Sequence, residues 1–391
     1  MVNLLPTGNV LLELGTLGVL AVPLVLHFCP KRDKKQKKFN DFFHNSNLRI
    51  KGRKGNYIYP KLIDSKKQGE NELYIYSIPN GMAKSQFEAK KEALEHQLKG
   101  KVEMWNVNNR LFIKSMTQTL PRKVDFEQVE LGNYHLGASI GHSHEGYIIN
   151  DFSSSGCHLL IAGPTDSGKS VALRQAVLSM LLEYSPQYLK MNLIDLKQGL
   201  EMSLFEDMPH VEVIDNIDDT LLILQELNKE INYRGNILKR RELTSIYQAN
   251  LDSPRIVTVI DEFAELSSDD TIMEQVDRIL RLGRASGIHL IVSTQRPTVD
   301  VITGNMKNNI QARIALNTPS QIDSKTILDN SMAAQLPPFK GRAIFKKSSR
   351  CTEIQIPFVD PKTAKKIMQE RLKEIGSKKE EKPAEFQGEM I

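Results

Sequence analysis

Cysteine is scarce in this chain of 391 residues, which contains only Cys29, Cys157 and Cys351. The three lie far apart and show no metal-ligand spacing, which argues against a disulfide framework and against a cysteine-held metal site. Such usage is typical of a protein kept in a reducing compartment, and it assigns the three thiols no chemical role.

Basic residues are missing before the long apolar run at residues 10–29. A cleaved signal peptide carries its positive charges ahead of the apolar run, so this pattern argues against one. The run has about the length of one bilayer-crossing helix, although Glu13 and Pro23 weaken that interpretation. KRDKKQKK follows at once at residues 31–38, and the positive-inside rule then places the N-terminus outside and the rest in the cytoplasm. We predict a single-pass anchor in the cell membrane; the alternative is a buried soluble helix.

Acidic residues are in the minority at the front of the chain. Residues 1–150 hold 22 lysines and arginines against 14 acidic residues, a net charge of +8. Residues 151–360 have a net charge of −5, and residues 361–391 one of +2. The basic front suits an anionic partner, either lipid headgroups or nucleic acid, and charge alone does not distinguish the two.

The stretch GPTDSGKS, residues 163–170, has the spacing G-x-x-x-x-G-K-[ST] of a phosphate-binding loop. The other motifs of the chain are interpreted in relation to this loop. An apolar run at 159–162 precedes it as a buried strand, and a helix-forming run at 171–182 follows it. Backbone N–H groups and a helix N-terminus then point at one place where phosphates bind. Lys169 is expected to reach the terminal phosphates of ATP and Ser170 to hold Mg²⁺. The predicted nucleotide-binding residues are Gly163, Pro164, Thr165, Asp166, Ser167, Gly168, Lys169, Ser170 and Val171.

Two carboxylates follow a second buried strand. Residues 256–260 are apolar or β-branched and lead directly to Asp261 and Glu262. ATP hydrolysis needs one carboxylate near the metal and another that orients the attacking water. We therefore predict that Asp261 binds the metal and that Glu262 positions the water.

Gln295 and Arg284 are the remaining catalytic candidates. Gln295 follows a buried strand at 288–293, where its amide is placed to sense the γ-phosphate. Arg284 lies at the end of a helix beginning at residue 271, from which it would point into a neighbouring subunit's site and stabilise charge on the transferred phosphoryl group. Arg281 is close by, and for either arginine a role as a cation that complements the helix dipole is equally consistent with the sequence.

Alternating strands and helices at residues 151–360 predict an α/β fold with a mostly parallel sheet, helices on both faces and the ligand at the carboxyl ends of the strands. Further strands are expected at 189–196, 312–316 and 342–345, and further helices at 218–241 and 361–375. From residue 377 the charged tail of the terminal segment, 361–391, is expected to be disordered.

The front of the chain divides into an anchor with its basic segment, residues 1–38, and a linker with a small α+β adaptor module, residues 39–150. Strands are predicted at 72–78, 101–105 and 110–115, and an amphipathic helix at 86–98. The module either helps subunits to pack, guides a substrate, or is a structural connection that precedes the motor region and has no further role.

Across residues 136–360 the chain resembles the FtsK/SpoIIIE family of DNA-pumping ATPases. The resemblance rests on GCHLLIAGPTDSGKSV, with His158 ahead of the strand, on DLKQGLEMSLFEDMPHV, on GRASGIHLIVSTQRPTVDVITGNMKNNIQARIAL from residue 283, and on QIDSKTILD from residue 321. It implies a RecA-like P-loop motor that forms a hexameric ring around double-stranded DNA and moves it by sequential ATP hydrolysis. The resemblance carries over to Lys169, Ser170, Asp261, Glu262 and Gln295. In the related coupling ATPases of conjugation, the arginine that acts in trans corresponds best to Arg284.

The chain also departs from the family. Family P-loops carry glycine where this chain has Asp166; aspartate tolerates left-handed backbone, so the loop can keep its shape, and the added carboxylate is expected to reduce ATP affinity. Lys340-Gly341-Arg342-Ala343 replaces a glycine-aspartate turn of the chromosome translocases and is closer to the coupling proteins of conjugative elements. One candidate membrane helix and a short segment after the motor also favour a mobile element.

We therefore expect a membrane-anchored, ATP-driven translocase of double- or single-stranded DNA that delivers DNA, with its relaxase, to the proteins of a conjugative channel. The alternatives are chromosome segregation at division, a protein cargo, and a non-hydrolysing membrane receptor for a DNA–protein complex. Arg296, Lys307 and Arg313 are candidates for a basic lining of the DNA pore.

Overall fold

The computed structural model describes residues 30–52, 55–68, 71–116, 120–197, 199, 201–248 and 253–380. The predicted anchor at residues 10–29, Cys29 and the end of the tail at 381–391 lie outside these ranges. No helix within the described ranges is both long and apolar enough to cross a bilayer.

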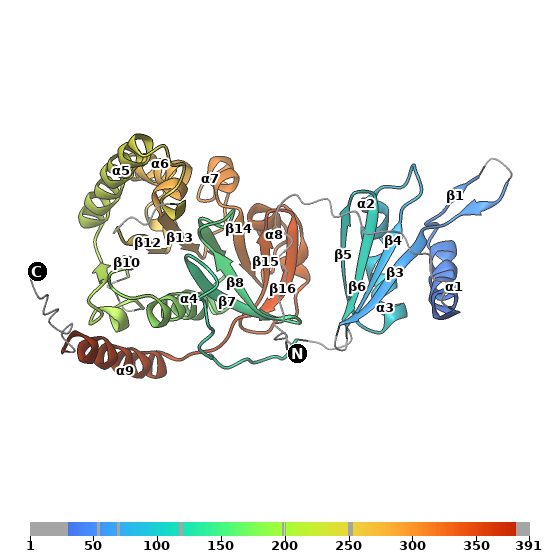
Figure 1. The fold of residues 1–391 in the computed structure, drawn as a ribbon, viewed down its shortest axis with the longest axis horizontal. Coiled ribbons are helices and arrows are strands. Elements are labelled where there is room, and N and C mark those ends of the chain that lie inside the picture. The colour runs from blue at the N-terminus through green and yellow to red at the C-terminus, as the bar shows by residue number, and fades with distance from the viewer. Residues whose placement is uncertain are drawn as a thin grey trace, which may run out of the picture.

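A ten-stranded sheet is the largest element of the described chain (Figure 1). In order across the sheet its strands are β11 (Val211–Ile214), β10 (Leu189–Asp195), β12 (Arg255–Asp261), β13 (Ile288–Thr294), β9 (Leu159–Ala162), β14 (Ala312–Leu316), β15 (Arg342–Lys347), β16 (Arg350–Gln355), β7 (Gly137–Ser143) and β8 (Gly146–Asp151). The strands predicted for this region are all present, and β11, β16, β7 and β8 are additional.

The sheet is mixed, so the expectation of a mostly parallel sheet is right for one half only. The strands from β11 to β14 are parallel, whereas β14, β15, β16, β7 and β8 pair antiparallel. Two-residue turns join β15 to β16 and β7 to β8, and such short turns can only produce antiparallel neighbours. Because β7 belongs to this sheet, the sheet begins at Gly137 and not at residue 151.

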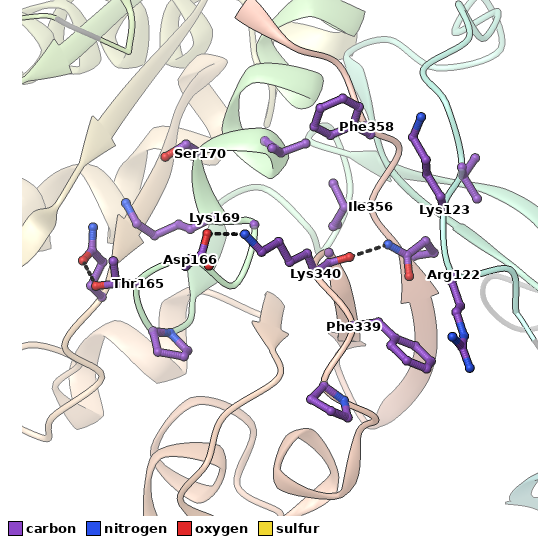
Figure 2. A pocket seen from close by; sticks show the side chains of 18 residues that line it. Arg122, Lys123, Thr165, Asp166, Lys169, Ser170, Phe339, Lys340, Ile356 and Phe358 are labelled. Atoms are coloured by element: carbon purple, nitrogen blue, oxygen red, sulfur yellow. Dashed lines mark hydrogen bonds and ion pairs between the residues drawn. The ribbon is translucent and has the colours of Figure 1, made fainter.

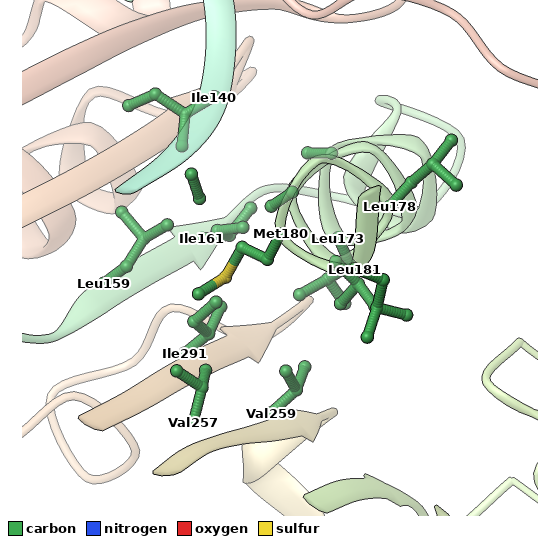
Figure 3. Packing of buried hydrophobic residues seen from close by; sticks show 14 of the residues in the cluster. Ile140, Leu159, Ile161, Leu173, Leu178, Met180, Leu181, Val257, Val259 and Ile291 are labelled. Carbon is green, nitrogen blue, oxygen red and sulfur yellow. The ribbon is translucent and has the colours of Figure 1, made fainter. Parts of the chain in front are cut away.

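Helices cover both faces of the sheet, as predicted. Leu159 and Ile161 of β9 pack under α4 (Lys169–Glu183), where Figure 3 shows them beside Met180. Leu160 and Ala162 belong to the core on the other face, with α5 (Ile217–Arg240) and α6 (Asp270–Ser286). Burial on both faces explains why the central strands are continuous apolar runs.

Three more helices complete the motor region: α7 (Gly304–Asn309), α8 (Gln321–Leu328) and α9 (Pro361–Glu380). The helix α9 packs against α4, with Ala364 and Met368 buried in the shared core. It continues to Glu380, whereas the rest of the tail predicted to be disordered, residues 381–391, lies outside the described ranges.

The N-terminal module contains a four-stranded antiparallel sheet and three helices (Figure 1). The strands, in order, are β3 (Lys61–Gln68), β4 (Asn71–Ser77), β6 (Arg110–Met116) and β5 (Lys101–Val107); the helices are α1 (Pro30–Asn45), α2 (Lys84–Glu88) and α3 (Lys91–Leu98); and a small hairpin joins β1 (Ile50–Lys51) to β2 (Tyr57–Ile58). The three predicted strands are confirmed.

The helical prediction for this module was wrong in one respect. The single helix expected at 86–98 is divided into α2 and α3, because Lys90 leaves the helical region with a ψ of 12°. The basic segment at 31–38, assigned above to the anchor, lies in the first half of α1, so a single helix crosses the predicted boundary at residue 38. Its second half carries Phe39 and Phe43, which lie 5.3 Å from the Tyr76 ring and anchor α1 to the sheet.

Candidate active site

The P-loop, residues 163–170, connects the end of β9 to the start of α4. Gly168 has a φ of 108°, and a Cβ atom there would lie 2.9 Å from the backbone nitrogen of Gly341. Glycine is therefore required at this position by conformation and by space. Asp166 has a φ of 66°, so this carboxylate-bearing residue adopts the left-handed backbone expected of it.

Lys169 and Asp261 form a buried ion pair, with side chains that are 4% and 3% exposed. The Lys169 ammonium also donates to Ser293 Oγ at 3.1 Å, and that hydroxyl donates to Asp261 Oδ1 at 2.6 Å. Burial acts to raise the pKa of Asp261, but the Lys169 charge and the hydrogen bonds from Lys169 and Ser293 outweigh burial and lower it. Asp261 is thus held as a carboxylate at the carboxyl end of β12.

Glu262 is the buried residue after β12, and three donors hold its carboxylate. Oε1 accepts from Thr294 Oγ1 at 3.1 Å and from the Gln295 backbone N–H at 3.0 Å, while Lys197 lies 3.3 Å from Oε2. Its φ of 57° is left-handed, a strained conformation for glutamate that persists only where neighbours enforce it. The ends of β10 and β13 therefore fix the orientation of this carboxylate.

Gln295 connects Glu262 to the P-loop. Its backbone N–H binds Glu262, and its side-chain Oε1 accepts a hydrogen bond from Thr165 Oγ1 at 2.7 Å. The structure thus brings together residues predicted from three separate stretches of the sequence: the P-loop, Asp261-Glu262 and Gln295. It also identifies Lys197 as a partner that the sequence argument missed.

Arg284 lies away from this group. It is exposed near the end of α6, and its charge acts on the thiol of Cys157, which precedes the amino end of β9. Burial nevertheless raises the pKa of that thiol. The P-loop lies at the carboxyl end of the same strand, so Arg284 is at the opposite edge of the sheet from the P-loop of the same chain.

A cavity of about 670 Å³ opens beside the P-loop. The predicted residues Lys169, Ser170 and Gln295 line it (Figure 2). So do residues that sequence reasoning missed, among them Arg122, Lys123, Phe339, Lys340 and Phe358. These residues come from three segments that are distant in the sequence and meet only in the fold. The one sequence signal for them was the departure from the family turn at Lys340-Gly341.

Lys340 neutralises Asp166. Their charged groups are 2.5 Å apart across the P-loop, although both side chains are about three-quarters exposed (Figure 2). The same segment is held to the loop by a hydrogen bond from the Gly341 N–H to the Ser167 carbonyl at 2.8 Å. The reduction in ATP affinity expected from a carboxylate near the phosphates is therefore made smaller by the neighbouring Lys340 cation.

Replacing this carboxylate should strengthen ATP binding slightly. In Asp166→Gly the repulsion disappears and Lys340 becomes available to the phosphates, so we expect ATP affinity to rise by about two- to five-fold, as fits an exposed ion pair. Titration calorimetry would measure it, and the gain should vanish in Asp166→Gly combined with Lys340→Ala. An unchanged or weaker affinity in Asp166→Gly would contradict the expected penalty.

Two of the three candidate pore residues have structural roles. Arg313 is buried and donates to the carbonyls of Ile310 and Ile327, and with Lys307 and Lys346 it surrounds the carboxylate of Asp329. Burial acts to raise the pKa of Asp329, but the hydrogen bonds from these three cations hold it well below its usual range. The prediction that Arg313 lines a pore was wrong, because a buried guanidinium cannot meet DNA. Arg296 is exposed and keeps that role as a proposal.

Comparison with known proteins adds the identity of the motor region. The model of the FtsK/SpoIIIE family matches residues 127–252 and 243–299, which include the P-loop, Asp261, Glu262 and Gln295. Residues 127–299 of this chain belong to the FtsK/SpoIIIE family. This confirms the resemblance on which the sequence argument relied.

Curated DNA translocases named FtsK also match this chain. The DNA translocase FtsK of Clostridium tetani is 34% identical over 264 residues, which are 64% of this chain and 35% of that protein. That of Helicobacter pylori strain 26695 is 36% identical over 225 residues, 54% of this chain and 26% of the relative. The chain therefore spans about a third or less of the length of these relatives.

Among the solved structures that resemble this chain are a conjugation coupling protein and a secretion ATPase. The pCW3 conjugation coupling protein TcpA, solved with ATPγS, is 25% identical with a TM-score of 0.60, and the match covers 87% of this chain and all of TcpA. The cytoplasmic domain of the type VII secretion ATPase EccC of Thermomonospora curvata is 26% identical with a TM-score of 0.54, over 65% of this chain and 33% of EccC.

Proposed function

We propose that this chain is an ATP-driven DNA translocase that serves conjugation. The observation that carries the proposal is the single network in which Lys169 meets Asp261 while Gln295 joins Glu262 to the P-loop, in a member of the FtsK/SpoIIIE family. The network groups a phosphate-binding lysine with two carboxylates and an amide beside a cavity large enough for a nucleotide.

Each group has a role in hydrolysis. The P-loop amides and Lys169 bind the β- and γ-phosphates, and Gln295 contacts the γ-phosphate from the end of β13. Glu262 orients a water molecule and accepts its proton on a carboxylate oxygen as the water oxygen bonds to the γ-phosphorus. The bond from that phosphorus to the bridging oxygen breaks, so ADP and phosphate are the products.

The residues present fit Mg²⁺. Ser170 lines the cavity with a hydroxyl, and Asp261 is held as a carboxylate; both are oxygen donors of the kind Mg²⁺ prefers. Among the described residues no group of three or more His, Cys, Asp or Glu side chains forms a protein-only metal site. Mg²⁺ bound to the nucleotide would neutralise charge on its phosphates, which is its usual part in such sites.

Conjugation is favoured by the match to TcpA, which extends over 87% of this chain and all of TcpA, and so includes more than the motor. We propose that the chain forms a hexameric ring in which Arg284 of each subunit acts on the neighbour's ATP. A membrane anchor, a relaxase–DNA cargo and a conjugative channel complete the proposal. Chromosome segregation is the second candidate, because the curated relatives are FtsK translocases.

DNA-dependent ATP turnover by the purified full chain tests the motor function. We expect double-stranded DNA to stimulate hydrolysis, Lys169→Ala to reduce it to background, and the exposed Lys190→Ala control to behave as the wild type. A chain that binds ATP and DNA without hydrolysing ATP would be a receptor. Deleting the gene and scoring both plasmid transfer and cell division then separates the two cargoes, since loss of division alone would contradict conjugation.

A further inference from the structure

The nucleotide cavity has two chemically unlike halves. One half holds the phosphate-binding groups Thr165, Lys169 and Ser170. Figure 2 shows the other half across the Lys340 side chain, where it presents apolar and cationic groups. Its residues are Arg122, Lys123, Val124, Phe339, Ile356 and Phe358. The proposed hydrolysis uses only the first half.

The first three of these residues belong to segment 120–126, which follows the N-terminal module. The buried Arg342 holds the beginning of this segment, since its Nη2 donates to the carbonyls of Leu120 and Pro121 at 3.0 and 2.9 Å. A β-bridge holds its end: the Phe358 N–H donates to the Val124 carbonyl at 2.7 Å, and the Phe126 N–H to the Phe358 carbonyl at 3.0 Å. The segment is thus fastened to the motor on both sides of Arg122 and Lys123.

The side chains on this wall suit a planar ring with polar edges. The Arg122 guanidinium lies 4.6 Å from the centre of the Phe339 ring, and the Lys123 ammonium 5.4 Å from that of Phe358. The Phe358 side chain is unusually exposed for a phenylalanine, at 45%. Exposed aromatic faces stack on nucleobases whatever their sequence, and guanidinium N–H groups donate to the ring acceptors of purines.

We infer that segment 120–126, together with Phe339 and Phe358, forms the site for the purine base of the nucleotide. The inference rests on the proposed ATP-binding function and adds the part of the chain that recognises the base. Segment 120–126 begins only four residues after β6 ends at Met116. The nucleotide is therefore bound jointly by the motor and by the connection to the N-terminal module, so occupancy of the cavity also stabilises the position of that connection.

Comparing ATP with inorganic tripolyphosphate tests this site, because only ATP carries a base. In the full chain we expect Phe358→Ala to weaken ATP binding by about ten-fold, the scale of one lost base–aromatic stack, and Arg122→Ala to weaken it less. Tripolyphosphate binding should be unchanged in both. Phe358→Trp should retain ATP affinity, and the exposed Arg110→Ala, outside the cavity, is the matched control for Arg122→Ala.

The outcomes separate the two proposals. Equal losses of ATP and tripolyphosphate binding, or ATP binding that is insensitive to both substitutions, would overturn the base site while leaving hydrolysis intact. A wild-type chain that binds ATP with the expected base dependence but hydrolyses none would overturn the proposed function and leave the base site standing. Arg122 is exposed, so its variant folds and remains informative if Phe358→Ala does not.

Discussion

Glu262→Gln is expected to stop ATP turnover while leaving ATP binding unchanged. Glutamine keeps the size and the hydrogen-bond acceptor that Thr294 and the Gln295 N–H require. It cannot accept a proton from water, and loss of a positioned general base costs about 10²- to 10⁴-fold in rate. Single-turnover hydrolysis by the full chain, with ATP affinity measured in parallel, would show kcat falling without a matching change in affinity.

The control for this substitution is Glu265→Gln. Glu265 lies three residues further on and is exposed. Glu265→Gln therefore makes the same chemical substitution as Glu262→Gln, at a position outside the hydrogen-bond network of Glu262. It should hydrolyse ATP as the wild type does. If Glu262→Gln retained most of its turnover, or lost ATP affinity to the same degree as kcat, the assignment of Glu262 to the attacking water would be wrong.

Arg284→Ala is expected to reduce turnover by about 10³-fold or more, the usual contribution of an arginine that stabilises phosphoryl transfer from outside the site. The side chain lies at the opposite edge of the sheet from its own P-loop, so the proposed action on a nucleotide requires the nucleotide of a neighbouring subunit. ATP binding to isolated subunits should therefore be unaffected. Mixing Arg284→Ala with Lys169→Ala chains should restore part of the activity, because some interfaces then pair an intact P-loop with an intact arginine.

Arg281→Ala is the matched control for Arg284→Ala. Arg281 lies one turn earlier on α6 and pairs with Asp277 at 2.9 Å within the same helix. Its loss should change little, as for other exposed helix pairs. Absence of any recovery on mixing, with both variants shown to assemble, would mean that Arg284 does not act between subunits and is a helix-end cation.

The buried central strands and the positions of the polar residues at their ends could be predicted from the sequence because both are local. The apolar strand β9 leads into the P-loop, β12 ends at Asp261, and β13 ends one residue before Gln295. The candidates Lys169, Asp261, Glu262 and Gln295 could therefore be found from pattern and spacing. Parallel strands place their carboxyl ends at one edge of the sheet, which is why these residues meet.

The other half of the cavity could not be predicted, because no local pattern marks it. Phe339, Phe358 and Arg122 are ordinary residues of turns and connections, and they meet only because antiparallel pairing returns the chain to the P-loop. Arg313 failed as a pore residue for a similar reason: a basic residue near a DNA-pumping motif suggests a phosphate contact, and only the fold reveals its bonds to Ile310, Ile327 and Asp329.

The position of β7 and β8 affects how this motor can be exchanged between proteins. These strands precede the P-loop in the chain, yet they occupy the edge of the sheet beside β16. A recombination junction at residue 151 would separate them from the other eight strands and leave the β16 edge open to pairing with foreign chains. A junction ahead of residue 120 would carry both the edge strands and segment 120–126 with the catalytic residues. The inheritable unit is therefore larger than the segment from the P-loop onward, because part of the wall of the cavity beside the P-loop is encoded upstream of β7, the first strand of the sheet.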